Sequence, residues 1–242
     1  SPVPRSDRSG ATTLALQPKR SDAPTKQSSG WIQSCQAATL TDSLPVVETF
    51  HSLQGEGIHA GRSAFFIRLA GCNVGCSWCD TKHSWPADSH PNRLVMDLAT
   101  EATAAAETGA AFVVITGGEP LHHNLDALTS AIRSSCELQP LHLETSGVDR
   151  LSGAPDWITL SPKRHRPPTP EMVQACHELK VVVHEPADLL FAEVVAAQAP
   201  QAHWLLQPGW DCEEGLQLAV SKVQQDQRWR LSMQSHKWLG VR

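Results

Sequence analysis

Three cysteines within a short stretch are the residues of this sequence best suited to chemistry. Cys72, Cys76 and Cys79 are spaced C-x3-C-x2-C, and thiolates are the usual ligands of iron–sulfur clusters. Gly71 and Gly75 allow the sharp bends that would wrap these thiolates around one cuboidal cluster. A cluster of four irons has one iron more than the motif has thiolates. One iron therefore stays open for another ligand, as the fourth position of a catalytic zinc site does.

A zinc site is the alternative for the same cysteines. Structural zinc takes four ligands, often from two C-x2-C pairs, and the sequence contains no second pair. His83 is the available fourth ligand for that alternative. An odd total of cysteines does not indicate a secreted disulfide framework, and the bunching favours a metal in a reducing compartment. The remaining cysteines are expected to be inert: Cys35, Cys136, Cys176 and Cys212.

Polar and glycine-rich motifs recur where apolar runs end. T-G-G-E-P at 116–120 follows the run F-V-V-I-T, and paired glycines at a strand end let the backbone approach a ligand closely. Three later motifs are E-T-S-G at 144–147, S-P-K at 161–163 and Q-P-G at 207–209. Each alone is compatible with an ordinary loop. Because ligands of parallel sheets sit at the carboxyl ends of the strands, together they predict a ring of polar groups around one face.

Strands alternate with helical segments from residue 45 onward, which is typical of βαβ units and a mostly parallel sheet. Strands are predicted over 46–50, 64–69, 112–116, 141–144, 157–160, 179–184, 203–207 and 230–233. Helices are predicted over 94–108, 124–134, 187–197 and 213–225. The fold class is therefore α/β, with a single domain over residues 45–242.

Residues 1–44 are rich in Ser, Thr, Pro and Gln and show no sustained apolar period. We interpret them as a disordered N-terminal extension. A transit peptide is the alternative, although prolines and charges interrupt any amphipathic helix there. The net charge of −5 and the lack of a long basic run do not indicate a nucleic-acid-binding face. No apolar run in the sequence has the length that spans a bilayer.

The cysteine spacing and the T-G-G-E-P element resemble the radical S-adenosylmethionine (SAM) superfamily, whose signature has an aromatic residue before the last cysteine, here Trp78. The resemblance implies a partial (β/α) barrel and a [4Fe–4S] cluster on Cys72, Cys76 and Cys79. It also implies SAM on the open iron, as the source of a 5′-deoxyadenosyl radical that abstracts hydrogen from a substrate. The residues that it assigns to SAM binding are Trp78, Cys79, Asp80, Gly118, Glu144, Ser161, Pro162, Lys163, Gln207, Pro208, Gly209 and Trp210.

Two further segments, T-F-H-S-L-Q-G-E-G at 49–57 and W-R-L-S-M-Q-S-H-K-W-L at 229–239, resemble the 7-carboxy-7-deazaguanine synthase family of queuosine and deazapurine biosynthesis. This resemblance covers residues 45–242. It implies conversion of 6-carboxy-5,6,7,8-tetrahydropterin to 7-carboxy-7-deazaguanine with loss of ammonia, supported by Mg²⁺ and with SAM regenerated. It also implies a flavodoxin-type electron donor, a homodimer and a cytoplasmic location.

The same resemblance assigns residues to the pterin and to the metal ion. Arg68 would pair with the substrate carboxylate through a forked, charge-assisted contact, and Glu56 would accept from ring N–H groups. Thr81 would bind Mg²⁺, an ion that takes few protein ligands and keeps several waters. Arg242 would contribute its terminal carboxylate. The full set of predicted substrate contacts is Leu53, Gln54, Gly55, Glu56, Arg68, Thr116 and Arg242.

Two other functions remain open from the sequence. The first is a glycyl-radical activase, which shares the cysteine loop and the G-G-E-P element but acts on a protein partner. The second is a non-catalytic zinc-binding interaction domain. His122 and His123 follow T-G-G-E-P, but adjacent helical residues point about 100° apart, so we expect a cap and a solvent-facing side chain rather than a metal site.

Overall fold

The structure, a computed structural model, describes residues 41–135 and 139–242. The predicted disordered extension lies outside these ranges as far as residue 40, as do Cys35 and Cys136. The first strand begins at Ser43, two residues before the predicted start of the domain.

One mixed sheet organises the described part of the chain. Its strands are β1 (Ser43–Leu53), β2 (Ser63–Leu69), β3 (Asn92–Leu94), β4 (Val113–Gly117), β5 (Leu141–Thr145), β6 (Trp157–Leu160), β7 (Glu178–Val183), β8 (His203–Pro208) and β9 (Trp229–Leu231). The order in the sheet is β3-β1-β2-β4-β5-β6-β7-β8-β9. All pairs from β2 to β9 are parallel, whereas β1 runs antiparallel to β2 and to β3. Because β3 and β9 are edges, the sheet is not closed, and the predicted partial barrel with a mostly parallel sheet is confirmed.

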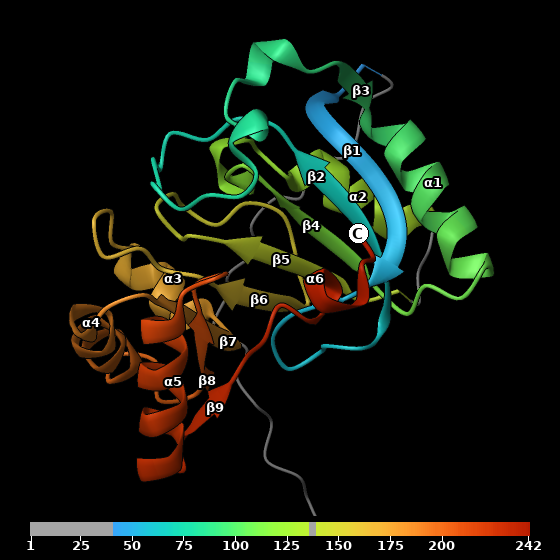
Figure 1. The fold of residues 1–242 in the computed structure, drawn as a ribbon. Helices are drawn as coiled ribbons and strands as arrows, with labels where there is room; N and C mark the ends of the chain where they lie inside the picture. The colour runs from blue at the N-terminus through green and yellow to red at the C-terminus, as the bar shows by residue number, and fades with distance from the viewer. Residues whose placement is uncertain (1–40, 136–138) are drawn as a thin grey trace, which may run out of the picture. The chain divides into compact units, whose positions relative to one another are not determined.

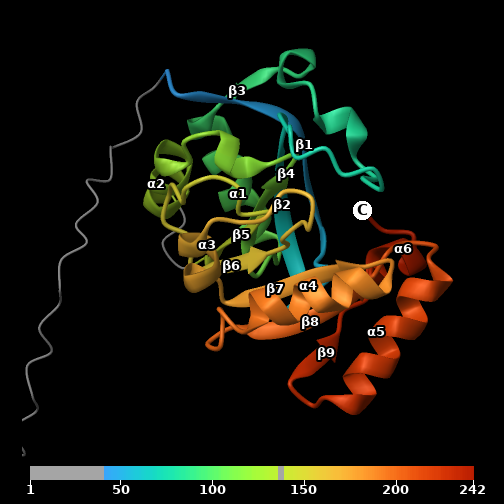
Figure 2. The same cartoon turned by 90° about the vertical axis from the view of Figure 1, so that its left-hand side faces the viewer.

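Helices flank the sheet (Figure 1, Figure 2). They are α1 (Val95–Glu107), α2 (Asp126–Ser135), α3 (Pro170–Ala175), α4 (Pro186–Ala196), α5 (Glu213–Gln225) and α6 (Ser235–Leu239). Short 3-10 turns are η1 (Lys82–Ser84), η2 (Ala87–Ser89) and η3 (Pro120–His122). In Figure 1, α2 lies behind β4 while α6 lies in front of the strands, near the C-terminus. None of the helices in the described ranges has the length and apolar character needed to cross a bilayer.

The main core forms between the outer helices and the sheet. Leu98 of α1 and Ile132 of α2 are fully buried in the same cluster as Ile115 of β4. The residues of β4 before its last glycine are all buried, as expected for a central parallel strand covered on both faces. This burial is why the run F-V-V-I-T is continuously apolar rather than alternating.

The elements that the sequence did not predict are the short ones, β3, α3 and α6. The two helices have six and five residues, fewer than two turns, and β3 has only three residues, so none of them displays a full hydrophobic period. The last strand was predicted over 230–233 but spans Trp229–Leu231. The segment after β9 instead leads into α6, which becomes important at the site.

Candidate active site

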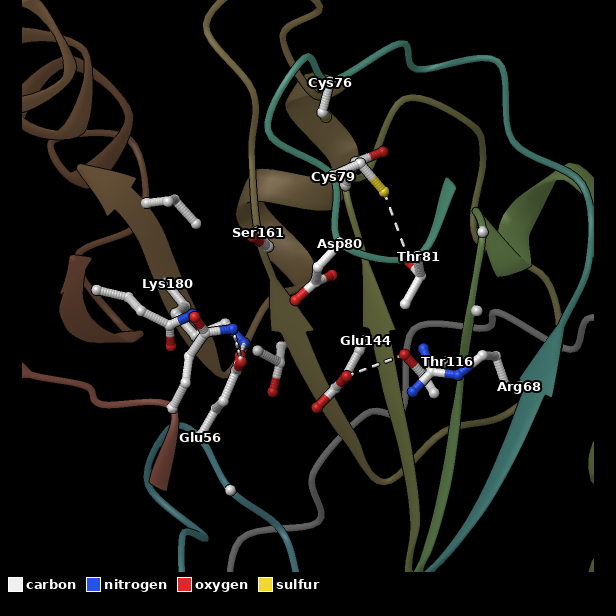
Figure 3. A pocket seen from close by; sticks show the side chains of 18 of the residues that line it. Glu56, Arg68, Cys76, Cys79, Asp80, Thr81, Thr116, Glu144, Ser161 and Lys180 are labelled. Carbon is white, nitrogen blue, oxygen red and sulfur yellow. Dashed lines mark hydrogen bonds and ion pairs between the residues drawn. The ribbon is translucent and has the colours of Figure 1, made fainter. Parts of the chain in front are cut away.

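A cavity of about 450 Å³ opens at the carboxyl ends of the parallel strands (Figure 3). The predicted site residues that line it are Leu53, Gln54, Gly55, Glu56, Arg68, Cys72, Cys76, Trp78, Cys79, Asp80, Thr81, Thr116, Gly118, Glu144, Ser161, Lys163, Gln207, Gly209, Trp210 and Arg242. Pro162 and Pro208 do not line it and are buried. Each lies between two lining residues, because successive residues of extended chain point in opposite directions.

The cysteine loop follows β2 and is anchored through its backbone. Its two glycines adopt positive φ angles, +100° at Gly71 and +79° at Gly75, which residues with a side chain rarely adopt. The Gly71 N–H donates to the carbonyl oxygen of Ser84 at 2.8 Å, and the Cys72 N–H donates to that of Trp85 at 3.1 Å. The loop is therefore a fixed turn that faces its cysteines toward the cavity.

Two histidines brace the same loop. His123 is the C-cap residue of η3, so the expectation of a cap is confirmed, but neither histidine is exposed, so the expectation of a solvent-facing side chain is wrong. The Asn73 N–H donates to Nε2 of His122 at 3.3 Å, while Nδ1 of His122 pairs with Asp149. Nε2 of His123 donates to the carbonyl oxygen of Ala70 at 2.7 Å. The contacts arise because β2 and β4 are neighbours in the sheet, which local spacing does not reveal.

The donor set fits an iron–sulfur cluster. Cys72, Cys76 and Cys79 line one cavity, and burial raises the pKa of the Cys72 and Cys76 thiols when no metal is bound. Among residues 41–135 and 139–242, no three His, Cys, Asp or Glu side chains converge on a single metal ion. In a cuboidal cluster each thiolate binds its own iron, so the cysteine sulfurs must lie further apart than the ligands of a single metal ion. The Thr81 hydroxyl lies 3.5 Å from the sulfur of Cys79.

The T-G-G-E-P element packs directly on this loop. The Gly118 N–H donates to the carbonyl oxygen of Leu69 at 2.9 Å, and the Glu119 N–H donates to that of Gly71 at 2.8 Å. A Cβ atom added at Gly118 would lie 2.4 Å from the same Gly71 oxygen. Only glycine permits this approach, so the motif and the cysteine loop form one unit.

The carboxylate of Glu119 has a structural role that the sequence did not indicate. It is almost fully buried and accepts from the Thr145 hydroxyl at 2.5 Å and from the Ser146 N–H at 2.8 Å. These bonds tie the ends of β4 and β5 together beneath the cavity, which satisfies a charge that would otherwise be costly to bury.

The cavity has two chemically different sides, which we name by their members. The cysteine side comprises Cys72, Cys76, Cys79, Ser161 and Lys163. The carboxylate side comprises Gln54, Glu56, Thr116, Glu144 and Lys180. Figure 3 shows Cys76 and Cys79 at one end of the cavity, and Glu56 and Glu144 at the other.

On the cysteine side, the ammonium of Lys163 donates to the hydroxyl of Ser161 at 2.7 Å and to its carbonyl oxygen at 2.9 Å. Burial lowers the pKa of Lys163, and the nearby sulfur of Cys76 opposes that shift only in part. This lysine is therefore positioned by neutral oxygens and is open to an incoming negative group.

On the carboxylate side, Glu144 accepts from the Gln54 amide at 2.9 Å and from the Thr116 hydroxyl at 3.0 Å. The resemblance assigned Glu144 to SAM binding, whereas the structure brings it together with two predicted substrate contacts. The three residues come from β5, from the segment after β1 and from β4, so the sheet aligns them.

Lys180 completes the carboxylate side and was not predicted. It is a buried residue of β7 that forms an ion pair with Glu56. Burial favours a higher pKa for Glu56, but the charge and hydrogen bond of Lys180 and a hydrogen bond from Gln234 outweigh it and lower that pKa to about 2. Burial likewise opposes the charge of Lys180, yet Glu56, Glu144 and Glu178 raise its pKa. Both partners of the pair are therefore charged.

Glu178 precedes Lys180 by two residues on the same face of β7 and supports the loop after β1. Its carboxylate accepts from the Ile58 N–H at 2.9 Å. A Cβ atom added at Gly57, where φ is +72°, would lie 2.1 Å from this carboxylate. Burial raises the pKa of Glu178 above its ordinary value, despite the opposing charge of Lys180. The loop is thus held from below by β7.

Two predicted substrate contacts, Arg68 and Arg242, share one carboxylate. Arg68 Nε donates to Oε1 of Glu48 at 3.0 Å, and a terminal nitrogen of Arg242 pairs with Oε2 at 2.7 Å. Both guanidinium groups lie over the ring of Phe50, at 5.9 and 5.5 Å from its centre. The hydroxyl of Ser52 donates to a terminal carboxylate oxygen of Arg242 at 2.6 Å. The Arg242 guanidinium thus joins this end of the cavity, where only its terminal carboxylate was expected.

Trp78, in the cysteine loop, stands partly exposed at the rim with a histidine on two sides. Its ring centre lies 4.7 Å from that of His184 and 5.6 Å from that of His165.

A Cβ atom at Gly209 would lie 2.2 Å from Nε2 of His184. The Q-P-G turn can therefore approach the end of β7 only because it contains glycine.

The segment after β9 closes over the loop after β1. Both the N–H and the hydroxyl of Ser235 donate to the carbonyl oxygen of Gly55, each at 2.9 Å. A Cβ atom at Gly55 would lie 2.0 Å from Nδ1 of His236. The Ser232 hydroxyl accepts from the Gly57 N–H at 2.9 Å. The motif S-M-Q-S-H-K is therefore part of the cavity wall.

Comparison with known proteins agrees with this geometry. The profile of the Radical SAM superfamily matches residues 66–177. Proteins named 7-carboxy-7-deazaguanine synthase from Prochlorococcus marinus and from Synechocystis are 52% and 46% identical, each over 84% of this chain and over 100% and 96% of their own lengths. The crystal structure of QueE from Escherichia coli superposes with a TM-score of 0.70 at 31% identity, covering 80% of this chain and 95% of that one.

Proposed function

The chain belongs to the 7-carboxy-7-deazaguanine synthase family of the radical SAM superfamily, and on that premise we propose how its cavity acts. It converts 6-carboxy-5,6,7,8-tetrahydropterin to 7-carboxy-7-deazaguanine and ammonia, for queuosine or other deazapurine biosynthesis. The product and ammonia together contain all the atoms of the substrate. The reaction is therefore redox-neutral overall, which is consistent with regeneration of SAM.

The cysteine side holds the cofactors. Cys72, Cys76 and Cys79 would bind a [4Fe–4S] cluster, and the open iron would take the amino and carboxylate groups of SAM. When bound, these groups supply hydrogen-atom abstraction. The chain positions them: Lys163 offers an ammonium that Ser161 holds in place, and the Gly118 backbone leaves room for close approach.

The other residues that we propose as SAM contacts also line the cavity. Trp78, Asp80, Gln207, Gly209 and Trp210 line it, and aromatic rings at a rim suit the adenine face.

The carboxylate side holds the pterin. A pterin presents a guanidine-like edge of N–H donors, which an ionised carboxylate accepts through charge-assisted bonds. Glu56 stays ionised because of Lys180, and Glu144 already accepts from Gln54 and Thr116. At the opposite end of the pterin, Arg68 would bind the substrate carboxylate, and Glu48 would fix the orientation of the Arg68 guanidinium. Leu53, Gly55 and Arg242 complete the wall of this side.

Thr81 would bind Mg²⁺ together with the substrate carboxylate and water. Its hydroxyl lies beside the sulfur of Cys79, between the two sides of the cavity. Magnesium takes few protein ligands and keeps several waters, so a single hydroxyl suits it.

Family membership supports three further proposals about the setting of the reaction. The electron donor is of the flavodoxin type, the protein is a homodimer, and it acts in the cytoplasm. Each extends the family pattern to this chain. A glycyl-radical activase or a zinc-binding interaction domain is not favoured, because the relatives are named for a deazaguanine synthase.

The observation that carries the proposal is that one cavity gathers three thiols and a fixed, ionised carboxylate in a chain 52% identical to a named synthase. The test is an oxygen-free assay of reconstituted protein with SAM, dithionite, Mg²⁺ and 6-carboxytetrahydropterin. Mass spectrometry should detect 7-carboxy-7-deazaguanine, with a slower rate when Mg²⁺ is omitted. Cleavage of SAM with no deazaguanine at any pterin concentration would contradict the proposal.

A further inference from the structure

Hydrogen-bonded side chains cross the cavity from the carboxylate side to the cysteine loop. We call them the relay, and in order they are Lys180, Glu56, Gln234, Lys237 and Asp80. They come from β7, the loop after β1, the segment around α6 and the cysteine loop. No local sequence pattern joins these segments; the tertiary fold does.

Gln234 is the central link. Its Nε2 donates to Oε1 of Glu56 at 2.8 Å, and its Oε1 accepts from the ammonium of Lys237 at 3.2 Å. An ionised carboxylate only accepts and an ammonium only donates, so these neighbours fix the orientation of the amide. Only a side chain with both a donor and an acceptor can join the two charges.

Lys237 carries the relay to the cofactor region. Its ammonium donates to Oδ2 of Asp80 at 2.6 Å and lies 4.8 Å from the ring centre of Trp210. Asp80 directly follows the cluster ligand Cys79. One lysine thus touches the cysteine loop, the turn that ends β8 and the amide held by Glu56.

The relay crosses the boundary of the superfamily match. That match covers residues 66–177 and includes Asp80, but it excludes Glu56, Lys180, Gln234 and Lys237. The contacts therefore connect the part of the chain that matches the superfamily profile to parts outside that match. Since the Asp80 side chain is 56% exposed, its ion pair with Lys237 contributes little to folding stability, so stability does not account for this end of the relay.

We propose that Gln234 and Lys237 are positioning residues that couple pterin binding on the carboxylate side to SAM binding on the cysteine side. A pterin that engages Glu56 changes how strongly that carboxylate holds the amide of Gln234, and the change passes through Lys237 to Asp80 and Trp210, which are predicted SAM contacts. This inference rests on the proposed function. Because coupling between two binding sites is reciprocal, SAM should tighten pterin binding by the same factor.

The test is calorimetric titration of SAM into the anaerobically reconstituted protein, with and without saturating pterin. In the unaltered protein, pterin should tighten SAM binding by about tenfold, within the usual range of coupling. In Gln234→Leu and in Lys237→Met, the factor should fall to about one. Because Lys237 contacts the predicted SAM residues Asp80 and Trp210, the affinity for SAM alone is measured in each variant as its own baseline, and the coupling factor is the ratio of the affinities with and without pterin.

Two controls make the result specific. Gln217→Leu removes an exposed Gln–Glu hydrogen bond of the same kind, from Gln217 to Glu213 on α5, and should keep the full coupling. Lys237→Arg retains a cation for Asp80 and should restore most of it. Circular dichroism of the Lys237 variants checks that they fold like the unaltered protein.

The outcomes separate this inference from the proposed function. Equal coupling factors in the unaltered protein, Gln234→Leu and Lys237→Met would overturn the relay, as would a factor of one in the unaltered protein that binds both ligands. If direct titration finds no pterin binding to the unaltered protein, the proposed function fails first and the relay with it.

Discussion

Lys163 and Lys180 stand on opposite sides of one cavity, yet the fold shifts their pKa values in opposite directions. Burial lowers the pKa of Lys163, whose ammonium rests on the oxygens of Ser161. Burial also opposes the charge of Lys180, but Glu56 and two further carboxylates raise its pKa. The difference shows that the nearby countercharge, rather than burial alone, decides the charge state.

The two sides are therefore prepared for different ligands. On the carboxylate side the negative charge is built in, so Lys180 and Glu56 neutralise one another before any ligand arrives. On the cysteine side the negative charge must come from thiolates and from a bound carboxylate. Among the described residues, Lys163 has no carboxylate partner and donates to the oxygens of Ser161. We therefore propose that the carboxylate side recognises N–H donors of its ligand, whereas Lys163 on the cysteine side recognises an anionic group.

Removing a thiol from the cysteine side should have the largest effect. Cys76→Ala should lose the cluster and all product formation, because the remaining two thiolates cannot hold a cuboidal cluster. Iron and sulfide analysis of the anaerobic protein measures this. Cys176→Ala removes a buried thiol away from the cavity and should retain both iron and sulfide. Full iron content in Cys76→Ala would refute the ligand assignment.

The same substitution at the two lysines sharpens the comparison. Lys180→Met leaves Glu56 buried without its ion pair, which should cost about 3–5 kcal/mol of unfolding free energy. Lys163→Met removes a poorly compensated ammonium, so its stability should change by less than about 1 kcal/mol or increase. Urea unfolding followed by circular dichroism measures both. Equal losses in the two variants would break the comparison.

Arg68→Ala tests the far end of the carboxylate side. Loss of a charge-assisted contact costs about 1.5–3 kcal/mol, so the pterin Kd should rise about tenfold to a hundredfold. SAM affinity in the absence of pterin should not change. The matched control is Arg133→Ala, which removes a comparable ion pair with Asp156 on the outer surface. Unchanged pterin affinity in Arg68→Ala would remove the carboxylate assignment.

The smallest expected effect is the loss of folding stability in acid as Glu56 becomes protonated. Its folded pKa of about 2 lies below the ordinary value of 4.5, so its ionised form stabilises the fold above pH 4.5, and this contribution is lost as the pH falls toward 2. Lys180→Met removes the charge and hydrogen bond that lower the pKa of Glu56. The effect of burial, which raises this pKa, then dominates. Unfolding midpoints measured from about pH 6 to 3 should therefore fall at higher pH in the variant. Parallel pH curves would contradict this.

Much of the site could be predicted because its motifs are local. The cysteine spacing, T-G-G-E-P and S-P-K each follow a strand, and a parallel sheet brings strand ends together. Period-two alternation would also have excluded Pro162 and Pro208, which lie between lining residues.

What the sequence did not reveal depends on contacts between distant segments. Lys180 offered one signal, a charge inside the apolar strand L-K-V-V-V, where an unpaired lysine would be costly. Its partner Glu56 lies 124 residues away, so no spacing rule identifies the pair. The same holds for Gln234 and Glu56, and for the histidines that brace the cysteine loop.

Mössbauer spectroscopy of protein reconstituted with ⁵⁷Fe, recorded with and without SAM, examines the open iron that follows from Cys72, Cys76 and Cys79 as its cysteine ligands. The site described here predicts that SAM changes the signal of one iron of the cluster and leaves the other irons unchanged. Irons that all remain unaffected by SAM, or a cavity that takes up zinc in place of iron, would contradict it.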